Sequence, residues 1–204
     1  MTQTECARAM AYGMMAVEDG IDALCLGEMG IGNTTSAAAI CCGLFGGDAA
    51  NWVGSGTGVT GEALQRKAAA VQEAIALHGP AFEDPFEVAR CIGHELSAII
   101  GAVLAARIAR VPVLLDGYAC TAAAAVLHQI DPAALDHCVV GHLSAEPGHR
   151  RLVDALGQIP VLDLGMRLGE GTGATLALGV LRAAISCHNG MSTFSEAQVD
   201  GPAR

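Results

Sequence analysis

Glu28 and Glu170 are the side chains whose setting most clearly indicates chemistry in this 204-residue chain. Each stands between glycines, in Gly27-Glu28-Met29-Gly30 and in Gly169-Glu170-Gly171-Thr172-Gly173. Glycines let other groups approach a carboxylate closely. Two carboxylates in one apolar crevice raise the pKa of at least one of them, which creates a usable general base. The alternative is that each glutamate only caps a neighbouring helix, and this is a fair rival for Glu170.

Two glycine-rich turns indicate a site for an anion. Residues 27–35 follow the apolar run 23–26 and precede an Ala-rich run, so a strand, a turn and a helix start are expected in that order. The free N–H groups of such a helix start favour phosphate. A second turn, Gly54-Ser55-Gly56-Thr57-Gly58, follows Trp52-Val53, which we expect to close another short strand. Neither turn has the spacing of a P-loop or of a Gly-x-Gly-x-x-Gly dinucleotide motif.

Polar residues follow the predicted strands at the points where they end. The strands are expected at 23–26, 111–115, 138–140 and 160–164, and they are followed by Glu28, Asp116, Ser144 and Glu170. In open parallel sheets the ligand crevice lies outside the carboxyl ends of the strands. We therefore expect these four side chains to converge on one rim.

Three further side chains each have an ordinary interpretation beside a functional one. Lys67 is either a solvated helix residue or a partner for an anionic ligand. Asp116 either holds a ribose hydroxyl or forms a turn with Gly117. Arg167 precedes Glu170 by three positions and could pair with it.

His142, Glu146 and His149 resemble a metal set, but their spacing is not His-Glu-x-x-His, so no metal site is expected.

The elements that must position these residues alternate along the chain. Helices are expected at 4–19, 61–78, 84 to about 109 with a break at Gly93, 120–129, 147–156 and 174–187, and a further short one at 192–199. The strands are apolar runs without period-2 alternation, as in a parallel sheet covered on both faces. The sequence predicts a single α/β domain over residues 1–204, with a three-layer Rossmann-like parallel sheet and helices on both faces.

Composition excludes several classes of protein. The net charge is -10 without a basic block, which argues against nucleic-acid binding. The most apolar region, 96–115, is interrupted by Arg107, Arg110 and Pro112, so no membrane span is expected. Eight cysteines without a Cys-x-x-Cys pair indicate reduced core thiols in a cytoplasmic protein. The high apolar fraction, 52%, favours a buried subunit interface and hence a homodimer.

Five motifs together resemble the nicotinate-nucleotide–dimethylbenzimidazole phosphoribosyltransferase (CobT) family. They are residues 27–35, 54–58, Leu114-Leu115-Asp116-Gly117, 141–146 and 167–173, in the order and spacing of that family over nearly the whole chain. The resemblance implies transfer of phosphoribose from nicotinate mononucleotide to 5,6-dimethylbenzimidazole, giving α-ribazole 5′-phosphate and nicotinate, with inversion at the anomeric carbon and without a cofactor.

The resemblance also implies roles for residues. Glu170 matches the family's proposed base, and Glu28 matches its second active-site glutamate. The implied substrate contacts are Gly30, Gly32, Asn33, Thr34, Gly54, Gly56, Thr57, Gly58, Lys67, Asp116, Ser144 and Leu168, of which Leu168 belongs to the apolar wall beside the benzimidazole. Ser55 is a departure, because the family usually has arginine in Gly-Arg-Gly-Thr-Gly, and a lost guanidinium weakens anion binding.

The resemblance covers the C-terminal portion of the family chain. The N-terminal part, which helps to build the aromatic-base pocket, has no counterpart in this sequence. Two alternatives to an enzyme therefore stay open. One is a nucleotide-binding module without turnover, and the other is a subunit that completes a site with another polypeptide.

Overall fold

A three-stranded parallel sheet lies at the centre of the protein. The computed structural model describes residues 1–200, and its strands are β1 (Leu24–Leu26), β2 (Val113–Leu115) and β3 (Cys138–Val140), in the spatial order β1-β2-β3. Leu24 lies opposite Val113, and Val113 lies opposite Cys138. Because all three strands run the same way, their carboxyl ends share one edge.

Helices make up most of the remaining chain. The α-helices are α1 (Gln3–Met14), α2 (Asn33–Phe45), α3 (Glu62–His78), α4 (Pro85–Cys91), α5 (His94–Ala109), α6 (Gly117–Ile130), α7 (Pro147–Ala155) and α8 (Thr172–Gly190). Short 3-10 helices are η1 (Ala49–Asn51), η2 (Gly79–Glu83) and η3 (Pro132–Leu135). Local sequence explains several starts, such as the Thr2–Glu5 capping box of α1 and Asp84 before Pro85 of α4.

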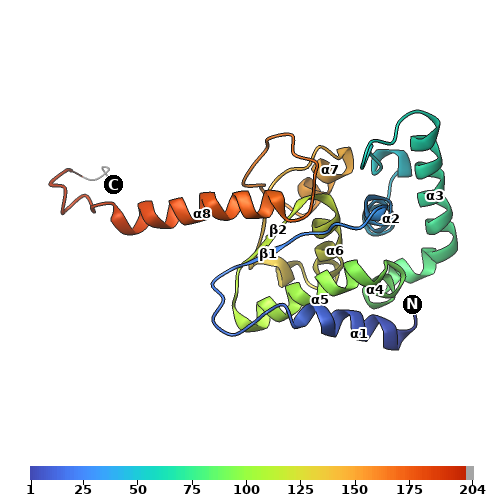
Figure 1. Ribbon diagram of the computed structural model, residues 1–204, viewed down its shortest axis with the longest axis horizontal. Coiled ribbons are helices and arrows are strands. Elements are labelled where there is room, and N and C mark those ends of the chain that lie inside the picture. The colour runs from blue at the N-terminus through green and yellow to red at the C-terminus, as the bar shows by residue number, and fades with distance from the viewer. Residues whose placement is uncertain (201–204) are drawn as a thin grey trace.

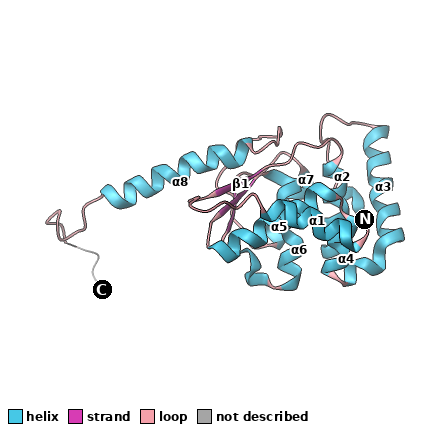
Figure 2. Ribbon diagram, turned by 60° about the horizontal axis from the view of Figure 1, so that its bottom comes forward, coloured by secondary structure: helices cyan, strands magenta, loops and turns pink. Residues whose placement is uncertain are grey.

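The alternation of side chains along β2 defines the layers. Val113 and Leu115 belong to the main core, whereas Leu114 packs with Ala174 and Ala177 of α8. The sheet therefore separates α8 from the helices of the main core, as the two ribbon views show (Figures 1 and 2). The predicted three-layer α/β fold is confirmed.

Small residues allow the helices to pack closely. A Cβ added at Gly101 of α5 would lie 2.7 Å from the carbonyl carbon of Met10, so that only glycine fits where α1 crosses α5. In α6, the run from Ala122 to Ala125 is fully buried. The low aromatic content, 3%, is consistent with this close packing of alanine and glycine.

Four predicted elements differ from the structure. Trp52 closes η1 and Val53 follows in a loop, so there is no strand at 52–53. The predicted strand 160–164 is reduced to one parallel bridge, His142 to Leu162, because the chain then turns into the loop ahead of α8. Residues 192–199 form turns rather than a helix. Helix α1 ends at Met14, not at 19, because Val17 and Ile21 pack on the core as the chain turns towards β1.

Helix α8 extends beyond the body of the molecule (Figure 1). Its first half packs on the sheet through Ala174 and Ala177, whereas residues 182–190 are exposed. Apolar side chains on it, including Leu176, Val180 and Ile185, are about half exposed. Within residues 1–200, no helix has both the length and the apolar character that a membrane crossing needs.

Candidate active site

A cavity of about 340 Å³ opens at the carboxyl edge of the sheet. It is lined by the loops that follow β1, β2 and β3, by the 54–58 turn and by the 165–171 loop ahead of α8. The predicted site residues that line it are Glu28, Gly30, Gly32, Thr34, Gly56, Thr57, Lys67, Asp116, Ser144, Leu168 and Glu170. The four strand-end side chains therefore do converge on one rim, even though the fourth run is not a strand.

The two glutamates are brought together through their backbones. The Glu170 N–H donates to the Glu28 carbonyl oxygen over 2.9 Å. A Cβ at Gly27 would lie 2.5 Å from the Gly171 Cα, so the two segments touch where only glycine fits. Glu170 itself has a left-handed backbone conformation, with φ of 59°, which residues other than glycine adopt uncommonly. Such strain at a pocket is a reason to examine the residue for function.

The Glu28 carboxyl is half-buried and held by hydrogen bonds. Its Oε1 accepts from the Gly30 N–H and from the Asn33 side-chain amide. Burial raises the pKa of Glu28, the two hydrogen bonds oppose this, and the neighbouring Glu95 raises it further, so that the net pKa is above its ordinary value. Glu28 therefore takes up a proton more readily than an ordinary carboxyl group does.

Lys67 is buried rather than solvated. Its side chain runs from α3 to the cavity, where Nζ donates to Thr34 Oγ1 and to the Gly54 carbonyl, each over 2.8 Å. Burial lowers the pKa of Lys67, and the nearby Glu146 partly offsets this. The ammonium has three donors and uses two of them, which leaves one for a ligand in the cavity.

The 54–58 turn is fixed from both sides. The Gly56 N–H donates to Glu146 Oε1 over 2.7 Å, and Arg167 Nη2 donates to the Gly56 carbonyl over 2.8 Å. The predicted ion pair of Arg167 with Glu170 is therefore wrong in this structure, because the guanidinium bonds to the opposite loop. Gly56 N–H is also unavailable to a phosphate while Glu146 holds it.

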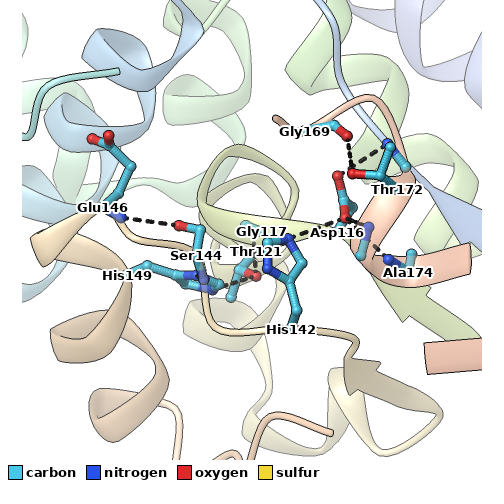
Figure 3. A network of polar contacts seen from close by, with 12 residues as sticks. Asp116, Gly117, Thr121, His142, Ser144, Glu146, His149, Gly169, Thr172 and Ala174 are labelled. Carbon is cyan, nitrogen blue, oxygen red and sulfur yellow. Dashed lines mark hydrogen bonds and ion pairs between the residues drawn. The ribbon is translucent and has the colours of Figure 1, made fainter. Parts of the chain in front are cut away.

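Asp116 fastens the start of α8 to the end of β2 (Figure 3). Its carboxylate accepts from the N–H groups of Gly171, Gly173 and Ala174 over 2.8 to 3.0 Å. His142 Nε2 lies 3.2 Å from Asp116 Oδ1. Burial alone would raise the pKa of Asp116, but His142 and the backbone donors outweigh it and leave that pKa below its usual value. The carboxylate thereby positions the loop that carries Glu170, and its predicted contact with the ribose stays a prediction.

A buried histidine determines the geometry of the Ser144 loop (Figure 3). His149 Nδ1 accepts from the Ser144 N–H over 2.9 Å, so Nε2 carries the proton and donates to Thr121 Oγ1 over 3.1 Å. Thr121 in turn donates to the Gly117 carbonyl over 2.7 Å. Burial, together with the nearby His142, lowers the pKa of His149 to about 3. A neutral histidine therefore links helix α6 to the loop that follows β3.

Three predicted residues do not line the cavity. Asn33 bonds to carboxylates, Gly54 gives its carbonyl to Lys67, and the Gly58 N–H donates to the Ser55 carbonyl. A Cβ at Gly54 would lie 2.5 Å from Glu146 Oε2, so this glycine makes room for the carboxylate.

Sequence reasoning left Glu146, His142 and Arg167 out of the predicted site. Their positions in the sequence could have indicated them, because Glu146 and His142 follow β3, and Arg167 precedes Glu170 in the same loop. Among residues 1–200, no cluster of three or more histidine, cysteine, aspartate or glutamate side chains is arranged to hold a metal ion.

Charge is distributed unevenly over the cavity. Lys67 and Arg167 bond to the 54–58 turn, whereas Glu28 and Glu170 are joined through their backbones. Each glutamate is close in sequence to an exposed apolar side chain, Met29 next to Glu28 and Leu168 two residues before Glu170. The fold and this site define a class: parallel α/β proteins with a strand-end pocket that offers cations to one part of a ligand and carboxylates to another.

Comparisons with known proteins name the family within that class. Residues 1–199 match the family described as "Phosphoribosyltransferase". Nicotinate-nucleotide–dimethylbenzimidazole phosphoribosyltransferases of Brucella canis and Rhizobium etli are both 58% identical to the chain, over 98% of it and over 59% and 60% of their own lengths. The crystal structure of CobT from Thermus thermophilus has a TM-score of 0.91 at 45% identity, covering 99% of this chain and 62% of that one.

The chain belongs to this phosphoribosyltransferase family. It spans about three fifths of the length of the curated relatives that it matches.

Proposed function

We propose that the protein transfers phosphoribose from nicotinate mononucleotide to 5,6-dimethylbenzimidazole, with α-ribazole 5′-phosphate and nicotinate as products. The observation that carries the proposal is the backbone contact that brings Glu28 and Glu170 to one cavity, which is also lined by the buried Lys67. The names of the relatives support the same reaction.

The nucleotide is proposed to lie with its phosphate near Lys67 and Arg167. Both cations are anchored by carbonyl oxygens, of Gly54 and Gly56 respectively, and both keep donors for an anion. Ser55 and Thr57 line the same part of the cavity and add hydroxyl groups. An arginine and a lysine held in this way compensate for the serine at position 55.

The reaction proceeds by displacement at C1′ of the ribose. One nitrogen of dimethylbenzimidazole attacks C1′ and forms the new N-glycosidic bond, while the bond to nicotinate breaks and its electron pair neutralises the positive ring nitrogen. The other imidazole nitrogen loses its proton to Glu170. Attack opposite to the leaving group inverts the β linkage to α.

Glu28 supports this step from the half-buried side of the pair. Its carboxylate faces positive charge that develops at the ribose as the nicotinate bond lengthens, and fixed charges are worth more in a site that excludes water. A positioned base contributes about 10²–10⁴-fold to the rate. Holding both substrates together in the cavity contributes further.

A second candidate is a nucleotide-binding module, or an incomplete subunit, without turnover. This candidate is supported by the length of the chain, because about two fifths of each curated relative is not matched by this sequence. Incubating the chain with both substrates and following nicotinate release separates the two. Release that depends on dimethylbenzimidazole supports the transferase, whereas calorimetric binding of the nucleotide without release supports the module.

We further propose a homodimer in the cytoplasm. The half-exposed apolar side chains of α8 provide a surface for a second copy, and sedimentation equilibrium measures the association. All eight cysteines are free thiols, which is usual in a reducing compartment.

A further inference from the structure

A third carboxylate lies next to the glutamate pair, on the side away from the cavity. Glu28 lines both the cavity and a neighbouring hollow of about 260 Å³, and Glu95 lines this second hollow together with Tyr12. Glu95 comes from the first turn of α5, and its side chain is exposed to solvent. It is 62 residues from Asn33 in the sequence, so no local motif connects it with the site.

One amide group links Glu95 to Glu28. Asn33 Nδ2 donates both to Glu28 Oε1 and to Glu95 Oε2. An amide nitrogen has two hydrogens, so both carboxylates can be served at once. The contact depends on Gly30, since a Cβ there would lie 2.9 Å from Glu28 Oε1 and would overlap the other two side chains.

Two negatively charged carboxylates thus accept hydrogen bonds from one neutral amide group. The negative charge of one carboxylate favours protonation of its neighbour, and the charge of Glu95 raises the pKa of Glu28. Glu28 is the half-buried partner and Glu95 the exposed one, so the cost of keeping both ionised falls mainly on Glu28. On the cavity side, the titratable and charged groups that line the same cavity as Glu28 are Lys67, Asp116, His142, Glu146, Arg167 and Glu170.

We propose that Glu95 is a positioning residue for the transfer reaction: through Asn33 it holds the Glu28 carboxyl at the edge of the cavity and sets how readily that carboxyl takes up a proton. The inference rests on the proposed function for its role in the reaction. The coupling between the two carboxyls, however, is a property of the chain alone and can be measured without substrate.

The direct test is a ¹³C NMR titration of the glutamate carboxyls in the 204-residue chain. The Glu28 signal is assigned by its loss in Glu28→Gln. In Glu95→Gln, which keeps the shape of the side chain and removes its charge, the Glu28 midpoint moves to lower pH by about half a unit or more. Glu62→Gln is the matched control. Glu62 is an exposed residue of α3 that pairs with Arg66, so its replacement should leave the Glu28 midpoint unchanged.

A purely structural role for Glu95 gives a different result. As an acidic residue in the first turn of α5, Glu95 also interacts favourably with the helix dipole. If that were its only role, Glu95→Gln would lower the unfolding free energy and leave the Glu28 midpoint where it was, and this outcome overturns the proposal.

The pH dependence of turnover supplies the second readout. Glu28 acts as a carboxylate, so activity falls as it is protonated, and Glu95→Gln moves that acidic limb to lower pH. An acidic limb that stays in place while the NMR midpoint moves overturns the role of Glu95 in the reaction. If the unmodified chain releases no nicotinate, the proposed function fails, and the NMR titration still decides the coupling.

Discussion

At the scale of single residues, the site consists of charges whose partners define their tasks. Glu146 and Asp116 bind backbone N–H groups and hold loops, whereas Glu28 and Glu170 meet at the cavity. Residue types and spacing were sufficient to predict that Glu28 and Glu170 lie at one rim, but they left open whether Lys67 is solvated, and in the structure it is buried. They could not predict Glu95 or the bond from Arg167 to Gly56, because these contacts join segments far apart in the sequence.

Replacing Glu170 by glutamine tests its role as the base. Glutamine keeps the backbone N–H that bonds to Glu28 and has nearly the same volume, but it cannot accept the imidazole proton. We expect kcat to fall more than about tenfold while the affinity for nicotinate mononucleotide changes little. Steady-state kinetics and calorimetry measure the two quantities. An unchanged kcat would remove Glu170 from this role.

His149 predicts a pH dependence of stability. Its pKa is about 3 in the folded protein and about 6.5 in the unfolded chain, so between these values the unfolded chain binds more protons. The stabilisation from a neutral His149 is therefore fully present above pH 6.5, and it decreases as the pH falls towards 3, by up to about 1.4 kcal/mol per unit.

The His149→Gln variant isolates this contribution. Glutamine can still accept from Ser144 and donate to Thr121 but does not titrate. Urea unfolding between pH 4 and 7 should show a flatter dependence for this variant than for the unmodified chain. His188→Gln, at an exposed position of α8, is the control and should keep the full slope. Equal slopes in all three proteins would contradict the assignment.

At the scale of elements, the position of the site follows from three short parallel strands that end at one edge. The strands at 24–26, 113–115 and 138–140 were predictable because they are short apolar runs bounded by glycine or polar residues. The run at 160–164 is also mostly apolar, but it contains Pro160 and Asp163 and forms a single bridge, from Leu162 to His142. Strand pairing depends on the free edge of β3 and on the path of the following loop, and the local sequence pattern predicts neither.

The contact between the β1 loop and the α8 loop makes a prediction about Gly27. In Gly27→Ala the added Cβ would lie 2.5 Å from the Gly171 Cα and would push Glu28 and Glu170 apart. We expect a loss of about 1–3 kcal/mol in unfolding free energy and a large loss of turnover. Chemical denaturation and nicotinate release measure these effects.

Gly179→Ala is the matched control for that substitution. A Cβ at Gly179, within α8, would meet no atom within 4 Å. Alanine also favours helix over glycine by about 1 kcal/mol, so this variant should be at least as stable as the unmodified chain. If both alanine variants behaved alike, the close contact at Gly27 would not be what joins the two loops.

At the scale of the whole molecule, the segments at the carboxyl ends of the three strands surround one cavity. The cavity draws on every strand end and on segments from Glu28 to Glu170, and the glycine-rich turns frame it. Composition and periodicity predicted this architecture because alternating strands and helices allow few arrangements. The exposure of α8 could not be inferred from periodicity, since it concerns the surface rather than core packing.

The anomeric configuration of the product shows whether the proposed displacement takes place in this chain. The chain is incubated with nicotinate mononucleotide and 5,6-dimethylbenzimidazole, and proton NMR of the C1′ position follows the product. Direct displacement in one cavity predicts α-ribazole 5′-phosphate as the only anomer, formed in equal amount to the nicotinate released. A β anomer, or no product from nucleotide that calorimetry shows to be bound, would contradict the account.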